Sequence, residues 1–285
     1  MPHSCAGREA TPGPARTVHW ADTGRRGDNG MWLRLRQIAL VAERLGDAER
    51  ALGEVFDLKV CYRDPGVAHF GLENALLPIG DQLLEVVAPT RAETAAGRYL
   101  ERRRGDGGYM VITQCDDHAP RRARIEELGI RVVNQFETHE FRNMQLHPKD
   151  TGGSFFEIDE QVGPDAHAPN GPWEPAGPDW QAHRSLSRVS AIAAAEIQCD
   201  DPNAVAARWS QIAEIPLDDD AGAPTLPLAN ARLRFVPCRD GRPEGLAGLD
   251  LVATDPDAVR AAARARGALG DDGLVHLCGM RFRLV

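Results

Sequence analysis

The chain has 285 residues, of which 42% are hydrophobic and 26% are charged, and its formal net charge at pH 7 is −9. This composition is typical of a globular protein, and the acidic balance argues against a nucleic-acid surface, which needs clustered lysine and arginine. No apolar run approaches the roughly 18 residues of a membrane helix, no secretory signal follows the N-terminus, and six scattered cysteines without a C-x-x-C pair favour a reduced, cytoplasmic protein. Residues 1–30 are rich in Gly, Pro, Arg and Asp without a hydrophobic period, which predicts a disordered leader.

Hydrophobic periodicity divides residues 31–160 into two similar units. In the first unit we expect a strand, a helix and three further strands, at residues 35–41, 45–56, 59–62, 68–72 and 82–88. A connecting helix is expected at residues 94–104. The second unit is expected to repeat the order, at residues 108–114, 119–128, 131–134, 142–146 and 154–159. The repetition predicts two pseudo-symmetric halves.

One acidic residue in each unit stands in the middle of an apolar strand. Glu85 shares one face of its strand with Leu83 and Val87, and the other face is also apolar, so we expect its carboxylate to be buried. Burial of an unpaired carboxylate is costly, and such a group normally has a hydrogen-bonding, cationic or metal partner. The alternative is that Glu85 lies near a sheet edge and reaches water. Glu157 has similar apolar neighbours in the last strand of the second unit.

Beyond the two units, residues 161–187 hold several prolines and glycines, which predicts a linker or a wrapping segment. Trp173 and Trp180 are expected to anchor it. From residue 188 to residue 285 a similar order of strands and helices recurs. Strands are expected at residues 189–197, 231–236, 248–253 and 280–284, and helices at residues 202–212 and 256–266. The chain therefore predicts four copies of a strand–helix–strands unit, two in each half.

Four segments carry a family resemblance: residues 36–41, 84–89, 107–112 followed by two aspartates, and 147–157. Together they resemble the vicinal oxygen chelate (VOC) superfamily, which includes glyoxalase I, methylmalonyl-CoA epimerase, extradiol dioxygenases and bleomycin-resistance proteins. Residues 198–202 and 245–251 match it more loosely. The resemblance implies an α+β fold in which tandem βαβββ modules form curved, cup-shaped sheets. It further implies two VOC domains, paired internally or also as a homodimer.

The resemblance also implies a site. In the metal-dependent members, four side chains from the first, fourth, fifth and eighth strands hold a divalent ion that stabilises an enolate. These positions fall on Gln37, Glu85, Met110 and Glu157. Met110 replaces the usual histidine, and a thioether is a poor ligand for hard divalent ions. We therefore expect no metal, with a weakened Ni, Mn, Mg, Fe or Zn site on the other three residues as the alternative.

Without a metal, Glu85 and Glu157 would be close like charges, and one of them should hold a proton at neutral pH. Such a pair of carboxyl groups can serve as acid and base. Further side chains are expected to contact a ligand in the cup: His69 on a short strand as a substitute imidazole, Gln114, Asn143 and Gln145. Tyr109 is one residue out of phase with Met110 and is expected to face away from the cup.

In the second half, the corresponding positions fall near Ala193 or Ala194 and near Leu233 or Arg234, without a carboxylate or imidazole. This domain is expected to be degenerate. The leading hypothesis is a glyoxalase-like protein that binds a small oxygenated metabolite in the first cup, with lyase or isomerase chemistry. The alternative is a non-catalytic protein that sequesters a small molecule, as bleomycin-resistance relatives do. A ring-cleaving extradiol dioxygenase is less favoured, because it needs two histidines and a glutamate on iron.

Overall fold

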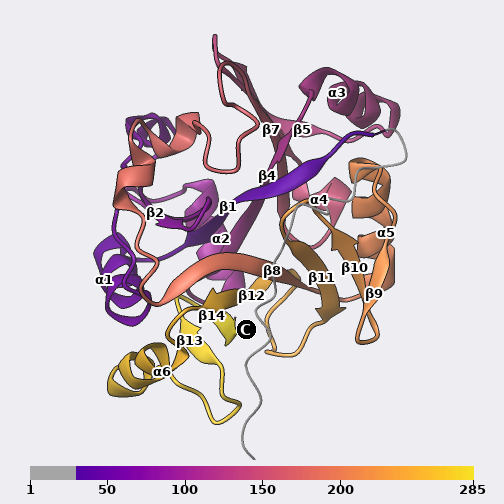
Figure 1. Cartoon of the computed structure of the whole chain (residues 1–285). Coiled ribbons are helices and arrows are strands. Elements are labelled where there is room, and N and C mark those ends of the chain that lie inside the picture. Colours follow the sequence, from indigo (N-terminus) through magenta and orange to yellow (C-terminus); the bar gives the residue numbers. More distant parts are fainter. Residues whose placement is uncertain (1–29) are drawn as a thin grey trace, which may run out of the picture.

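The computed structural model describes residues 30–285, which form two seven-stranded mixed sheets with helices around them (Figure 1). All but the last residue of the expected leader lies outside the described residues. The first sheet has the order β2-β3-β1-β4-β7-β6-β5. Its strands are β1 (Leu33–Val41), β2 (Leu72–Ile79), β3 (Gln82–Pro89), β4 (Gly107–Cys115), β5 (Val132–Glu137), β6 (Phe141–Leu146) and β7 (Phe155–Gln161). The expected α+β architecture of cup-shaped sheets is confirmed.

The second sheet repeats this topology, in the order β13-β14-β12-β8-β11-β10-β9. Its strands are β8 (Val189–Cys199), β9 (Asp218–Asp220), β10 (Ala223–Pro227), β11 (Arg232–Pro237), β12 (Gly245–Ala253), β13 (Val275–Leu277) and β14 (Met280–Leu284). In both sheets an antiparallel pair, β1–β4 or β8–β12, lies at the centre, and each central strand has a parallel neighbour. Strands β3 and β7 of the first sheet therefore correspond to β11 and β14 of the second.

Side-chain caps mark the start of several of the helices. They are α1 (Leu45–Phe56), α2 (Ala95–Arg103), α3 (His118–Glu127), α4 (Pro148–Thr151), α5 (Pro202–Ala213) and α6 (Pro256–Ala265). The side chain of Thr94 accepts a hydrogen bond from Gly97 N, and those of Asp201 and Asp255 accept from Ala204 N and Ala258 N. Each cap satisfies an N–H group that the first helical turn leaves free. No helix among residues 30–285 is long and apolar enough to cross a membrane.

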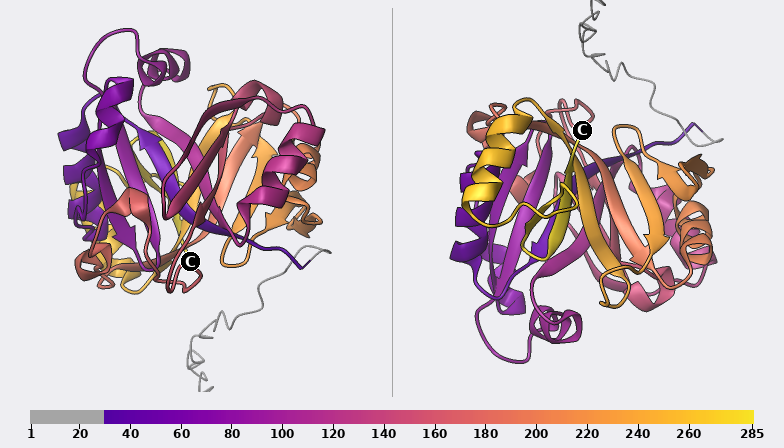
Figure 2. Two further views of the ribbon diagram at one scale, coloured as in Figure 1. Left: turned by 90° about the horizontal axis from the view of Figure 1, so that it is seen from above. Right: turned by 90° about the horizontal axis from the view of Figure 1, so that it is seen from below.

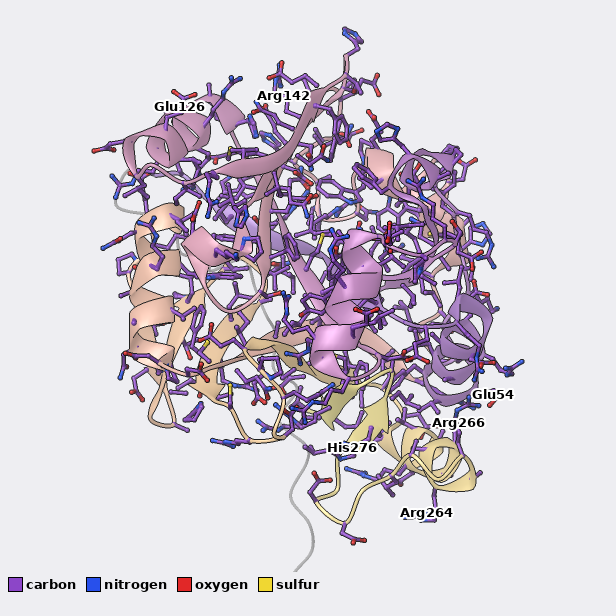
Figure 3. The ribbon with its side chains drawn as sticks, turned by 180° about the vertical axis from the view of Figure 1, so that it is seen from behind. Glu54, Glu126, Arg142, Arg264, Arg266 and His276 are labelled. Atoms are coloured by element: carbon purple, nitrogen blue, oxygen red, sulfur yellow. The ribbon has the colours of Figure 1, made fainter. Side chains whose placement is uncertain are left out.

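The two sheets share one hydrophobic core on their convex sides. It joins Ile38 and Leu84 of the first sheet to Ile192 of the second. The rings of Phe156 and Trp209 stack across the interface, with centroids 4.2 Å apart. Helix α1 packs against α6, and α5 against α3 and α4, at opposite sides of the molecule (Figure 2). Glu54 of α1 and Arg266 at the end of α6 form an ion pair at this contact (Figure 3).

Two expected strands of the first unit are wrong. Residues 68–72 mostly belong to a 3₁₀ helix, η1 (Pro65–Phe70), and residues 59–62 contribute only an isolated bridge between Tyr62 and Leu76. The Asp64 side chain accepts a hydrogen bond from Gly66 N, and Pro65 fits the first helical position, so this segment turns instead of extending. Strand β2 begins only at Leu72.

The segment between β7 and β8, residues 162–188, is here called the strap. It contains two short 3₁₀ helices, η2 (Glu174–Ala176) and η3 (Trp180–His183). In Figure 1 it is the salmon ribbon that runs from β7 past β2 to β8. Trp173 and Trp180 are each 1% exposed, so the expected anchoring of this segment by its two tryptophans is confirmed.

Candidate functional site

Two β-bulges shape the concave face of the first sheet, called the first cup. The register of β1 on β4 shifts between Leu35 and Gln37, and again between Ala39 and Leu40. A bulge places two residues opposite one and interrupts the alternation of side chains. Because of the second bulge, Tyr109 has no partner in β1, and its ring packs on Phe155, with centroids 5.1 Å apart. The expectation that Tyr109 faces away from the cup is therefore wrong.

Glu85 lies in this cup and is 8% exposed. Its Oε1 accepts a hydrogen bond from Asn74 Nδ2 at 2.6 Å, and its Oε2 accepts one from Gln37 Nε2 at 2.9 Å. Burial raises the pKa of Glu85, and the two amide donors oppose that rise. Strand β3 lies between β2 and β1, so the alternative of a sheet-edge carboxylate is wrong.

Glu157 lies across the cup on β7, two residues before Asp159 on the same face. Burial raises the pKa of Glu157 to about 7, and the negative charge of Glu85 contributes to the rise. Asp159 is fully buried, and its Oδ1 accepts hydrogen bonds from Asn143 Nδ2 at 3.0 Å and Met144 N at 3.3 Å. Burial and the neighbouring Glu157 raise the pKa of Asp159.

The structure thus brings Glu85 and Glu157 to one concave face, where the charge of Glu85 contributes to the raised pKa of Glu157. They do not share a hydrogen bond: the Glu85 oxygens accept from carboxamides, whereas Glu157 has Asn143 and Asp159 as neighbours. Asp159 is a member of this acidic group that the sequence analysis did not single out. Its position two residues from Glu157 in an apolar strand was the available signal.

The strap covers the Gln37 side of the cup. Trp173 Nε1 donates a hydrogen bond to Gln37 Oε1 at 3.0 Å, and the Trp173 ring meets Phe141 edge-on, with centroids 5.1 Å apart. The guanidinium of Arg36 lies over the rings of both Trp173 and Trp180, at 5.4 and 5.1 Å. Arg36 is 1% exposed and also donates to the carbonyl oxygens of Pro169 and Gly171.

Gln114 is hydrogen-bonded to the strap and is not free to contact a ligand in the cup. Its Oε1 accepts two hydrogen bonds from Arg34, at 3.0 and 2.7 Å, and its Nε2 donates to the carbonyl oxygen of Ala166 at 2.8 Å. Arg34 donates to the carbonyl oxygens of Ala166 and His167 as well. Burial lowers the pKa of Arg34 to about 10 and that of Arg36 to about 9.

Met110 and Gln145 remain half-buried beside the acidic group. Gln145 Nε2 lies 3.5 Å from Met110 Sδ, which is a weak acceptor. Asn143 is buried and bound to Asp159. His69 is exposed on η1, so the expectation of a strand imidazole facing the cup is wrong. In the described part of the chain, no histidine lies on a strand of the first sheet.

The four positions that the resemblance assigns to a metal do not fit a hard divalent ion. Gln37 Oε1 accepts the Trp173 indole N–H, and both oxygens of Glu85 accept amide N–H groups. The fourth position is the thioether of Met110, a soft ligand. Within residues 30–285 no three His, Cys, Asp or Glu side chains are grouped so that they could hold a metal.

The concave face of the second sheet, called the second cup, carries paired charges. Arg234 donates to both carboxylate oxygens of Asp250, at 2.6 and 3.0 Å. Arg281 donates to Glu196 Oε1 at 2.8 Å and to Asp240 Oδ2 at 3.0 Å. A cavity of about 20 Å³ lies among Glu196, Asp250 and Arg281. The sequence analysis considered only the positions near Ala193 or Ala194 and near Leu233 or Arg234, and Glu196, further along β8, is a carboxylate of this cup that it did not single out.

Comparisons with known proteins agree with this architecture. A sequence model of the glyoxalase-like domain matches residues 38–213, whereas no curated protein sequence matches. A hypothetical protein from Staphylococcus aureus, 12% identical, covers 89% of this chain and 99% of its own with a TM-score of 0.61, and shares the fold. Methylmalonyl-CoA epimerase from Streptomyces coelicolor is 23% identical over 46% of this chain and 98% of its own, with a TM-score of 0.41. The enzyme from Mycobacterium tuberculosis is 22% identical over 47% and 91%, with the same score. The match of the domain model over more than half of the chain shows that this protein belongs to the glyoxalase-like domain family of the VOC superfamily.

Proposed function

We propose that the first cup binds a small oxygenated metabolite and moves a proton on it, as a lyase or isomerase does, without a metal ion. One observation carries the proposal: two buried carboxyl groups, Glu85 and Glu157, line one concave face in different surroundings. A general acid or base works best when its pKa lies near the working pH. Glu157, with a pKa of about 7, meets that condition.

Each polar side chain then has a role. Glu157 removes a proton from a carbon next to a carbonyl group. Gln145, whose amide is 3.5 Å from the weakly accepting Met110 sulfur, donates to the carbonyl oxygen on which negative charge develops. Glu85, whose pKa is also raised by burial, returns a proton from the other side of the cup. Trp173 excludes water from the Gln37 side.

Exchange of carbon-bound hydrogen with solvent deuterium tests this proposal directly. Two probes are the hemithioacetal of methylglyoxal with glutathione, and methylmalonyl-CoA, each followed by proton NMR in the presence of EDTA. We expect exchange with the wild-type protein, and a loss of about 100-fold or more in Glu157→Gln. Glu196→Gln, in the second cup, is the matched control. Undiminished exchange in Glu157→Gln, or exchange only after addition of Ni, Mn or Zn, would contradict the proposal.

The aromatic lining favours a second function, binding without chemistry. Phe155, opposite Met110 in the sheet, is half-buried, and a partly exposed ring of this kind can stack on an aromatic ligand. Under this alternative, aromatic compounds would raise the melting temperature while neither probe exchanges deuterium. Loss of this binding in Glu157→Gln, with no deuterium exchange in either protein, would assign the cup to sequestration.

A further inference from the structure

Strand β5, at the edge of the first sheet, gathers exposed apolar side chains. Within residues 30–285, six large hydrophobic side chains are exposed, and three of them lie on this strand. They are Val132, Val133 and Phe136, with exposed fractions of 37%, 45% and 44%. Every residue of β5 is exposed or half-buried. An apolar strand at an open sheet edge favours pairing with another strand.

The other three sheet edges of the described chain are covered or carry charge. At the edge of β2, Cys61 N donates to Leu76 O at 2.8 Å and Leu76 N donates to Tyr62 O at 3.0 Å. Residues 268–270 bridge the edge of β13 in a similar way. Strand β9 is short and consists of three aspartates, Asp218–Asp220. Covered, short or charged edges resist pairing with another chain, so β5 differs from the other three.

The ladder between β5 and β6 shows which backbone groups of β5 face the open edge. After a bulge near its start, β5 pairs regularly with β6 from Asn134 to Glu137. Thr138 N donates to Phe141 O of β6 at 2.8 Å. In an antiparallel ladder, residues that bond to one neighbouring strand alternate with residues whose backbone groups point the other way. The N–H and C=O groups of Gln135 and Glu137 therefore point to the open edge.

Phe136, between these two residues, is held in place although it is exposed. Its ring packs against Phe141, with centroids 5.9 Å apart, and Phe141 in turn packs against Trp173 of the strap. An aromatic side chain that is fixed before association loses little conformational freedom when a partner covers it. Helix α3 lies beside β5 (Figure 1), and its Arg122 is 3.7 Å from Glu137. The charge at this edge is thereby partly neutralised.

From these observations we infer that β5 pairs with β5 of a second copy of this chain, antiparallel about a two-fold axis at Phe136. The two Phe136 rings then form a non-hydrogen-bonded pair, in which side chains come closest. Gln135 of each copy lies opposite Glu137 of the other. Their outward backbone groups exchange hydrogen bonds, and the Gln135 amide donates to the Glu137 carboxylate. A two-fold interface needs a self-complementary patch, and β5 supplies one. This surface is independent of the chemistry of the first cup.

Sedimentation velocity of the intact wild-type chain over a range of concentrations tests the inference, and we expect a dimer that dissociates on dilution. Phe136→Lys places two ammonium groups face to face at the axis and should raise the dissociation constant about tenfold or more. Gln135→Glu sets a carboxylate opposite Glu137 and should weaken the dimer about fivefold, whereas Gln135→Lys should not weaken it. Leu186→Lys, at a strap position that is 51% exposed, is the matched control and should leave the dimer unchanged.

A wild-type chain that stays monomeric at every concentration would overturn the inference, whatever the variants do. A dimer that Phe136→Lys leaves intact would overturn it too, and equal dissociation constants for the two Gln135 variants would overturn the axis at Phe136. Amide hydrogen exchange of β5 identifies a different occupant. If the chain is a monomer whose β5 amides exchange rapidly only after deletion of residues 1–29, that segment covers the edge and the dimer inference falls. The substituted side chains are exposed, so melting temperatures close to the wild-type value show that the variants fold.

Discussion

The two cups of this chain share a topology but differ in the partners of their buried carboxylates. In the second, Asp250 and Glu196 each have an arginine within 3.0 Å. In the first, the donors to Glu85 among residues 30–285 are carboxamides, and Trp173 of the strap fills the Gln37 side. The charges of the second cup neutralise one another, whereas in the first cup burial raises the pKa values of Glu85, Glu157 and Asp159. The comparison indicates that the second cup neutralises its buried carboxylates with arginines and that the first stabilises them by hydrogen bonds and protonation.

The largest expected effect comes from removing the strap's contact with the first cup. Trp173→Ala deletes a ring that is 1% exposed, and we expect it to lower the free energy of unfolding by about 3–5 kcal/mol. Urea denaturation followed by circular dichroism measures the change. Trp173→Phe is the matched control, because it keeps a ring but leaves Gln37 Oε1 without its indole donor, which should cost about 1–3 kcal/mol. A loss below about 1 kcal/mol in Trp173→Ala would contradict the packing of the strap in the cup.

The next effect tests the ion pairs of the second cup. Arg234→Met leaves Asp250 with the more distant Arg283 as its ion-pair partner. Breaking a buried ion pair costs about 3–5 kcal/mol of stability. We expect the lower end of that range, because the side chains of Arg234 and Asp250 are each 10% exposed. The double variant Arg234→Met, Asp250→Leu removes both charges and should recover most of the loss. Denaturation of the two variants in parallel measures this coupling. If the double variant is as unstable as the single one, an unpaired Asp250 charge does not explain the stability lost in Arg234→Met.

A smaller effect concerns Glu157 of the first cup and appears only when stability is measured as a function of pH. Its folded-state pKa of about 7 lies above the value of about 4.3 expected in the unfolded chain. The protonated carboxyl therefore contributes stability that is fully present below about pH 4 and is lost as the pH rises through about 7. The loss should be on the order of 3 kcal/mol between those limits. Glu157→Gln cannot titrate and should show a flatter curve of melting temperature against pH. Parallel curves for the two proteins would mean that Glu157 is ionised throughout.

Local sequence patterns predicted many of the strands, helices and candidate site residues, whereas features that depend on tertiary packing were not predicted. The central strands and the capped helices were predictable, because alternation and capping residues are properties of neighbouring residues. Glu85 and Glu157 were found because an acidic residue interrupts an apolar strand. The same criterion would have found Glu196 and Asp250, which the family mapping passed over. The bulge at Tyr109 was not predictable, because a register shift depends on the partner strand. The docking of Trp173 on Gln37 joins residues far apart in the sequence, and composition alone does not specify it.

The smallest expected effect is the sharpest test of the difference between the cups, because it makes the same substitution in both. Glu196→Gln removes a charge that Arg281 pairs at 2.8 Å, so an arginine loses its partner, and about 1–3 kcal/mol of stability should be lost at pH 7. Glu85→Gln removes a charge that no lysine or arginine of residues 30–285 pairs, and relief of its burial offsets the hydrogen bond lost to Asn74 or Gln37. Its net change should stay within about 1 kcal/mol. Thermal and urea unfolding of both variants at pH 7 give the two values. Equal losses would mean that the Glu85 charge is compensated as fully as the Glu196 charge, which would contradict the difference between the cups.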